Sequence, residues 1–148
     1  MAEIKYIHSE ELRQNWPNYP ITYQMGNIGS EVSRSLKWTA KGKTERATTA
    51  IDRALELFDF TISANHKNPA RLREILIARE EFCDYFFGGN SWHTDPTKMQ
   101  RYYDGFVMID QLSHTHGFWF LGHNARKKEQ RSEAAIFVVL ECFPRKEE

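Results

Sequence analysis

The sequence has no excess of charge of either sign. Its 148 residues include 20 Lys or Arg and 20 Asp or Glu, so the formal net charge is zero. A chain without a global field does not attract nucleic acid or an anionic membrane as a whole, so such binding needs a local patch. The longest uncharged apolar run, residues 134–140, is far shorter than the roughly 20 residues that cross a bilayer. The sequence therefore predicts no transmembrane helix.

Cysteine is also scarce. Cys83 and Cys142 are far apart and have no paired spacing, which fits a reducing compartment better than a disulfide framework. The first residues mix charges with isolated apolar side chains and lack the continuous apolar stretch of a secretory signal. We therefore expect a cytoplasmic protein.

Signatures of catalysis and of cofactor binding are missing as well. No His has an acidic residue three positions before it, as di-metal sites in helical bundles usually require. His114, His116 and His123 cluster without an intervening carboxylate, and Gly26 and Gly29 give only a G-x-x-G fragment with no preceding strand. We predict no metal and no cofactor, and a small metal-binding or catalytic bundle is the least favoured alternative.

What the sequence does have is helical periodicity between Asn27 and Leu112. Four segments repeat apolar residues at spacings of three and four, and cap residues, prolines or glycines bound them. The segments run from Asn27 to the stop at Gly42, from a Thr44 cap to Ile62, from Asn68-Pro69 to Gly88-Gly89, and from Asp95-Pro96 to Leu112. In the third segment the apolar stripe consists of Leu72, Ile75, Leu76, Phe82, Cys83 and Phe86.

Short connections between these segments predict antiparallel neighbours, and hence an all-α, up-down four-helix bundle over residues 27–112. Residues 1–26 are interpreted as an N-terminal arm that Pro17 and Pro20 keep from forming a continuous helix. Residues 113–148 form a C-terminal extension of different character. Its apolar run could be a strand or a docked fifth helix, and we favour the helix.

Two places could contact a partner or RNA. Arg34 and Trp38 lie one helical turn apart and could present a cation and a ring together, although such a pair more often packs the Arg stem on the indole. The other place is a run of cations that could touch phosphate or simply form a solvated helix face. Its members are Arg126, Lys127, Lys128 and Arg131.

A third feature is a pair of charges beside apolar stripes. Arg79 falls on the stripe of the third segment, and Asp59 borders the stripe of the second. If these segments are antiparallel neighbours, the two residues form an interior polar pair. Such a pair more often fixes structure or register than performs a function.

Residues 26–112 resemble a family of small prokaryotic helical-bundle proteins. The resemblance rests on GSEV, the Lys37-Trp38 pair, RALEL, RLRE and the Asp-Tyr-Phe end of the third segment, whereas the tail after Leu112 looks unlike the family. It implies the architecture and no activity. More loosely, the chain resembles HEPN-like bundles, but it lacks the closely spaced Arg and His of their nuclease members, which implies a non-catalytic relative.

By elimination, we expect a non-enzymatic bundle that self-associates or binds a protein partner. The alternative is an RNA-associated, HEPN-like component of a toxin–antitoxin type of module.

Overall fold

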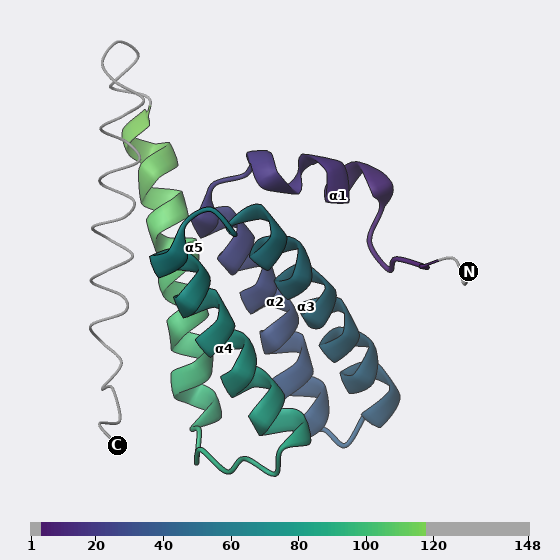
Figure 1. Cartoon of the computed structure of the whole chain (residues 1–148). Coiled ribbons are helices and arrows are strands. Elements are labelled where there is room, and N and C mark those ends of the chain that lie inside the picture. The colour runs from purple at the N-terminus through teal and green to yellow at the C-terminus, as the bar shows by residue number, and fades with distance from the viewer. Residues whose placement is uncertain (1–3, 118–148) are drawn as a thin grey trace.

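The computed structural model describes residues 4–117, in which every regular element is helical (Figure 1). The four long helices alternate in direction, so the predicted all-α, up-down four-helix bundle is confirmed (Figure 1). The elements are α1 (Glu10–Asn15), a 3-10 helix η1 (Trp16–Asn18), α2 (Ile21–Ala40), α3 (Thr44–Ala64), α4 (Pro69–Phe87) and α5 (Pro96–Gly117). Among these residues no helix has the length and apolar character needed to cross a bilayer.

Side-chain capping explains the starts of α1 and α4. The Ser9 side chain accepts a hydrogen bond from the Leu12 N–H at 3.2 Å and begins α1, and Asn68 caps α4 in the same way. The predicted Thr44 cap is wrong. Lys43 occupies the N-cap of α3 without a side-chain cap, and Thr44 is the first helical residue.

The N-terminal boundary of the bundle also needs correction. Helix α2 begins at Ile21 rather than Asn27, because Pro20 takes the extended N-cap position, where its missing N–H costs no helical hydrogen bond. Residues 21–26 therefore belong to the bundle and not to an arm. Trp16 is buried in the core, and its Nε1–H donates to Thr61 Oγ1 at 3.0 Å. At the other end, α5 continues past the expected stop at Leu112 to Gly117.

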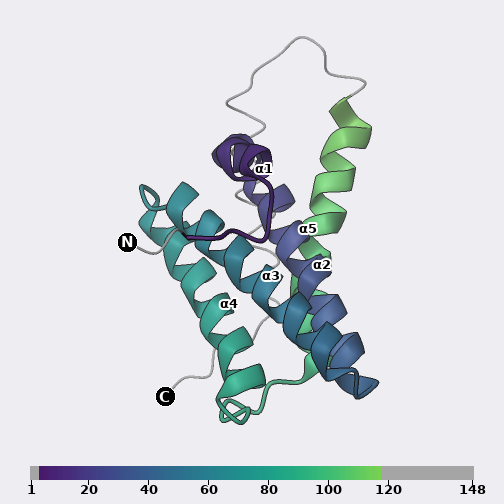
Figure 2. The same ribbon diagram turned by 90° about the vertical axis from the view of Figure 1, so that its right-hand side faces the viewer.

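The core lies between the helices and is contributed unevenly. Helices α2 and α3 bury long stripes, whereas within the described residues α4 buries only Ile75, Ala78 and Phe82, and α5 only three core residues. Figure 2 shows α4 at one edge of the bundle, beside α3 and away from α2. The core residues from the other long helices include Met25, Ile28, Val32, Ile51, Ala54, Leu57, Phe58, Met99, Tyr103 and Phe106.

The G-x-x-G fragment has a packing role. A Cβ on Gly29 would lie 2.4 Å from the Tyr103 Cβ, and a Cβ on Gly26 would lie 3.2 Å from Val107 Cγ2. Both glycines sit within α2 and face α5, so their missing side chains let the two helices approach closely.

Candidate functional site

The predicted pairing of Arg34 with Trp38 is replaced by another contact. Arg34 Nη1 donates to Glu31 Oε1 at 2.7 Å, and Arg53 Nε of α3 donates to the same oxygen at 3.1 Å. The Glu31 side chain is 5% exposed, so the two guanidinium groups neutralise a buried carboxylate between α2 and α3. Arg34 thus supports the helix pair.

Trp38 is half-buried, and three other cations surround it. Arg46 Cζ lies 4.7 Å from the ring centroid, and the Nζ atoms of Lys37 and Lys41 lie 5.5 and 5.6 Å away, distances typical of cation–π contacts. Gly42, at φ +65°, turns the chain sharply between α2 and α3 and brings Arg46 back toward the indole. The name "basic end" is used below for Trp38, Lys37, Lys41, Lys43 and Arg46.

Charge at the basic end is one-sided. Residues 34–46 contain five Lys or Arg and one acidic residue, Glu45, giving a net charge of +4 in a chain whose total is zero. Within residues 4–113, the cations of the basic end form no ion pair with a carboxylate. Sequence reasoning identified Trp38 but assigned it the wrong cation; the local charge count was the signal that could have found the others.

The predicted pair of Asp59 and Arg79 forms between α3 and α4. Arg79 Nη2 lies 3.5 Å from Asp59 Oδ1, but the side chains are 34% and 64% exposed respectively. The expectation of an interior pair is therefore wrong. An exposed ion pair of this kind contributes about 0–1 kcal/mol and marks no site.

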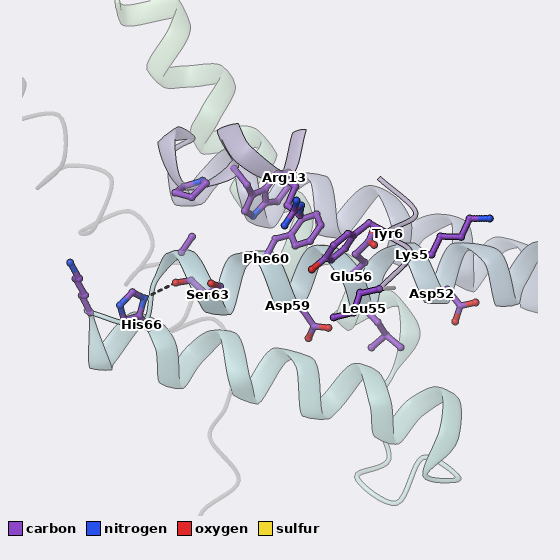
Figure 3. Close-up of a pocket in the computed structure, with 15 residues that line it drawn as sticks. Lys5, Tyr6, Arg13, Asp52, Leu55, Glu56, Asp59, Phe60, Ser63 and His66 are labelled. Carbon is purple, nitrogen blue, oxygen red and sulfur yellow. Dashed lines mark hydrogen bonds between the residues drawn. The ribbon is translucent and has the colours of Figure 1, made fainter. Parts of the chain in front are cut away.

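A hollow of about 830 Å³ lies between the N-terminal segment and α3 (Figure 3). The Tyr6 ring packs against Phe60, and the Arg13 guanidinium lies 4.4 Å from the Tyr6 ring centroid. His66 Nδ1 contacts the backbone carbonyl of Ser63 at 2.6 Å, rather than its hydroxyl (Figure 3). The hollow therefore brings together no activated nucleophile of the Ser–His type.

Glu56 of α3 anchors the segment that precedes α1. Its carboxylate accepts hydrogen bonds from the backbone N–H groups of Ile7 and His8 at 2.7 and 2.8 Å, and it also contacts the His8 ring. Burial opposes ionisation, but these hydrogen bonds outweigh it and hold the pKa of Glu56 below its ordinary value. This carboxylate is fully engaged in fixing the chain, which accounts for its perturbed pKa without a catalytic role.

The outer side of α4 leaves large apolar side chains exposed. Leu76 and Ile77 are 42% and 44% exposed, and they line an open groove of about 320 Å³ with Trp92 from the following loop. The prediction that Leu76 faces the core is wrong. Helix α4 lies at the edge of the bundle, and α3 covers only part of its apolar stripe, which leaves Leu76 exposed. The "outer α4 face" consists of Pro69, Leu72, Arg73, Leu76, Ile77, Glu80 and Trp92.

Two opposite charges flank the centre of this face symmetrically. Arg73 precedes Leu76 by three residues, and Glu80 follows Ile77 by three. Both are exposed, and neither has an ion-pair or hydrogen-bond partner within residues 4–113. The face is therefore complementary to itself when it is turned by 180°.

The remaining candidates are not brought together. Arg126, Lys127, Lys128 and Arg131 lie outside the described residues. His114 and His116 fall on the helical backbone of α5, and His123 lies outside the described residues. Within the described part of the chain, no group of three or more His, Cys, Asp or Glu could hold a metal ion.

Comparison of the chain with protein-family models, with curated proteins and with solved structures finds no match. The functional reading therefore rests on the residues of this chain.

Proposed function

We propose that this chain is a non-enzymatic interaction protein that self-associates through the outer α4 face. The supporting observation is the placement of two half-exposed apolar side chains, Leu76 and Ile77, between two unpaired charges of opposite sign. The cytoplasmic location expected from the cysteines is part of the same proposal.

The charges select one arrangement of two copies. A two-fold axis between Leu76 and Ile77 sets the two α4 helices antiparallel, with Arg73 of each copy opposite Glu80 of the other. Arg73 and Glu80 are about 10 Å apart along the helix, so both ion pairs lie beyond the apolar centre. Parallel packing in register would set Arg73 against Arg73, and like charges disfavour it.

The expected dimer is weak. Helix α4 has 19 residues and is about 28 Å long, and a helix face of this length buries less than the roughly 800 Å² per partner of a standard stable interface. We therefore expect a monomer–dimer equilibrium in the micromolar range.

Sedimentation equilibrium of the full chain over a range of concentrations tests the proposal. Arg73→Glu and Glu80→Arg each turn two attractive contacts in the dimer into repulsive ones. Each variant loses two attractive contacts and gains two repulsive ones. At about 0.5 kcal/mol for each of these exposed contacts, the dimer is destabilised by about 2 kcal/mol, which raises Kd roughly 30-fold. The double variant, with both charges exchanged, restores the dimer.

Arg101→Glu is the matched control, because it makes the same charge change at an exposed position of α5. It leaves the dimer unchanged. A wild-type chain that stays monomeric at all concentrations refutes self-association. A dimer that neither charge reversal weakens places the interface elsewhere and refutes the α4 arrangement.

A further inference from the structure

We infer that the basic end binds single-stranded nucleic acid, with Trp38 stacking on a base and the surrounding cations contacting phosphates. This site lies at the α2–α3 hairpin and does not depend on the outer α4 face.

The first argument is electrostatic. Residues 31–46, which include Glu31 as the partner of Arg34, still carry a net charge of +3 and create a local positive field in a chain whose total charge is zero. Glu31 pairs with Arg34 and Arg53, but no carboxylate pairs with Lys37, Lys41 or Arg46 within the described residues. Clustering these cations around one ring costs mutual repulsion, and a bound polyanion relieves it.

The second argument is the ring itself. Trp38 is half-buried and its carbonyl accepts the Lys43 N–H at 2.9 Å, so the hairpin turn fixes the backbone that supports the indole. A fixed aromatic ring with cations around it is the arrangement that single-strand binding proteins use, because every unpaired base has a face that can stack. The bases of a duplex are already stacked and are not available to it.

Membrane lipid is the other polyanionic surface to consider. Peripheral attachment to lipid requires several apolar side chains that insert together beside the cations. All large hydrophobic side chains of α2 and α3 are buried or half-buried, so Trp38 has no exposed apolar neighbour from these two helices. The composition of the basic end therefore favours a nucleic acid.

Fluorescence anisotropy with the full chain and a short labelled oligouridylate tests the inference. Binding should weaken with salt, with log K falling by about 0.7 per log unit of salt for each phosphate contacted, and hence by about 3 for four cations. A duplex of the same length should bind more weakly at equal salt.

Two substitutions, each with a control variant, locate the site. Arg46→Glu should lower the affinity at least tenfold and make the salt slope shallower by about 0.7. Lys67→Glu, the same change at an exposed residue near the opposite end of the bundle, should alter neither. Trp38→Leu should lower the affinity about tenfold at an unchanged slope, and Trp38→Phe should retain most of it.

Three results would overturn the inference. One is wild-type binding that is absent or insensitive to salt. Another is oligonucleotide binding that Arg46→Glu leaves intact, or that is lost only on substitution of Arg126, Lys127, Lys128 and Arg131. The third is binding to phosphatidylserine vesicles, but not to the oligonucleotide, that Arg46→Glu abolishes. Arg46 is exposed, so loss of folding does not confound its variant, and circular dichroism checks the Trp38 variants.

Discussion

Replacing Gly29 with alanine tests how closely α2 and α5 pack. The new Cβ would lie 2.4 Å from the Cβ and 3.2 Å from the Cγ of Tyr103, which is buried. The Tyr103 Cβ is bonded directly to the backbone, so no rotamer change can move it away. The helices must therefore separate by about 1 Å to reach the ordinary carbon–carbon contact distance of about 3.5 Å.

The magnitude follows from two opposing effects. Overpacking a core costs about 1–3 kcal/mol, and a contact this short with a backbone-linked atom lies at the upper end. Alanine in place of glycine inside a helix returns about 1 kcal/mol. The net loss is about 2 kcal/mol, which corresponds to a fall in Tm of roughly 6 °C for a chain of this size.

Urea and thermal denaturation, followed by circular dichroism, measure this loss. Gly26→Ala is the matched control, since its Cβ comes no closer than 3.2 Å to a neighbouring atom, Val107 Cγ2, and lies at the ordinary contact distance of 4.0 Å from the Val107 backbone. Its stability should stay within about 1 kcal/mol of the wild type. A Gly29→Ala variant that is as stable as the wild type would refute the close approach of the two helices.

Two further predictions concern titratable groups. Glu56→Gln should lose about 1–2 kcal/mol and speed hydrogen exchange at the Ile7 and His8 amides, because neutral acceptors bind N–H groups less strongly. Folding lowers the pKa of Glu56, so the stability that its carboxylate contributes is present above the ordinary pKa of about 4.5 and is lost as the pH falls through the folded value. The free energies of unfolding of the wild type and of Glu56→Gln should therefore converge in acid. A difference between them that does not change with pH contradicts this account. Burial raises the pKa of Tyr102 and Tyr103, so both should stay protonated in the folded chain above pH 10. Because the unfolded chain ionises them more readily, the free energy of unfolding should decline as the pH rises further. The tyrosinate absorbance of these two residues should appear only when the chain unfolds. A tyrosinate absorbance that accounts for all six tyrosines while the chain is still folded would show that these rings are accessible.

Local signals made most of the helices predictable. The Asn68-Pro69 start depends only on a capping side chain and a proline next to it, and the structure has both in place. The α3 stripe was equally readable, since Ile51, Ala54 and Phe58 share one face at helical spacing and are all buried. Such features need no knowledge of the neighbouring helices.

Features set by the neighbours could not be predicted in this way. Spacing places Leu76 on the same stripe as Ile75, but only the edge position of α4 leaves Leu76 exposed. Likewise, Arg46 reaches Trp38 across a hairpin turn, and no periodicity within one helix relates the two. A proline can end one helix or stand at the start of the next, and its sequence context does not distinguish the two. Pro20 is the N-cap of α2, although the sequence pattern alone assigns it to an arm without a continuous helix.

The two proposed surfaces can be tested separately because they lie on different parts of the bundle. The outer α4 face is centred on the middle of a helix, whereas the basic end lies at the α2–α3 hairpin, at the end of the bundle where α4 also ends (Figure 1). An antiparallel α4 pair therefore sets the two basic ends at opposite ends of the dimer. A short oligonucleotide occupies one end at a time, so dimerisation gives it no avidity. Reversing Arg73 then dissociates the dimer and leaves the affinity for a short strand unchanged, whereas reversing Arg46 does the opposite.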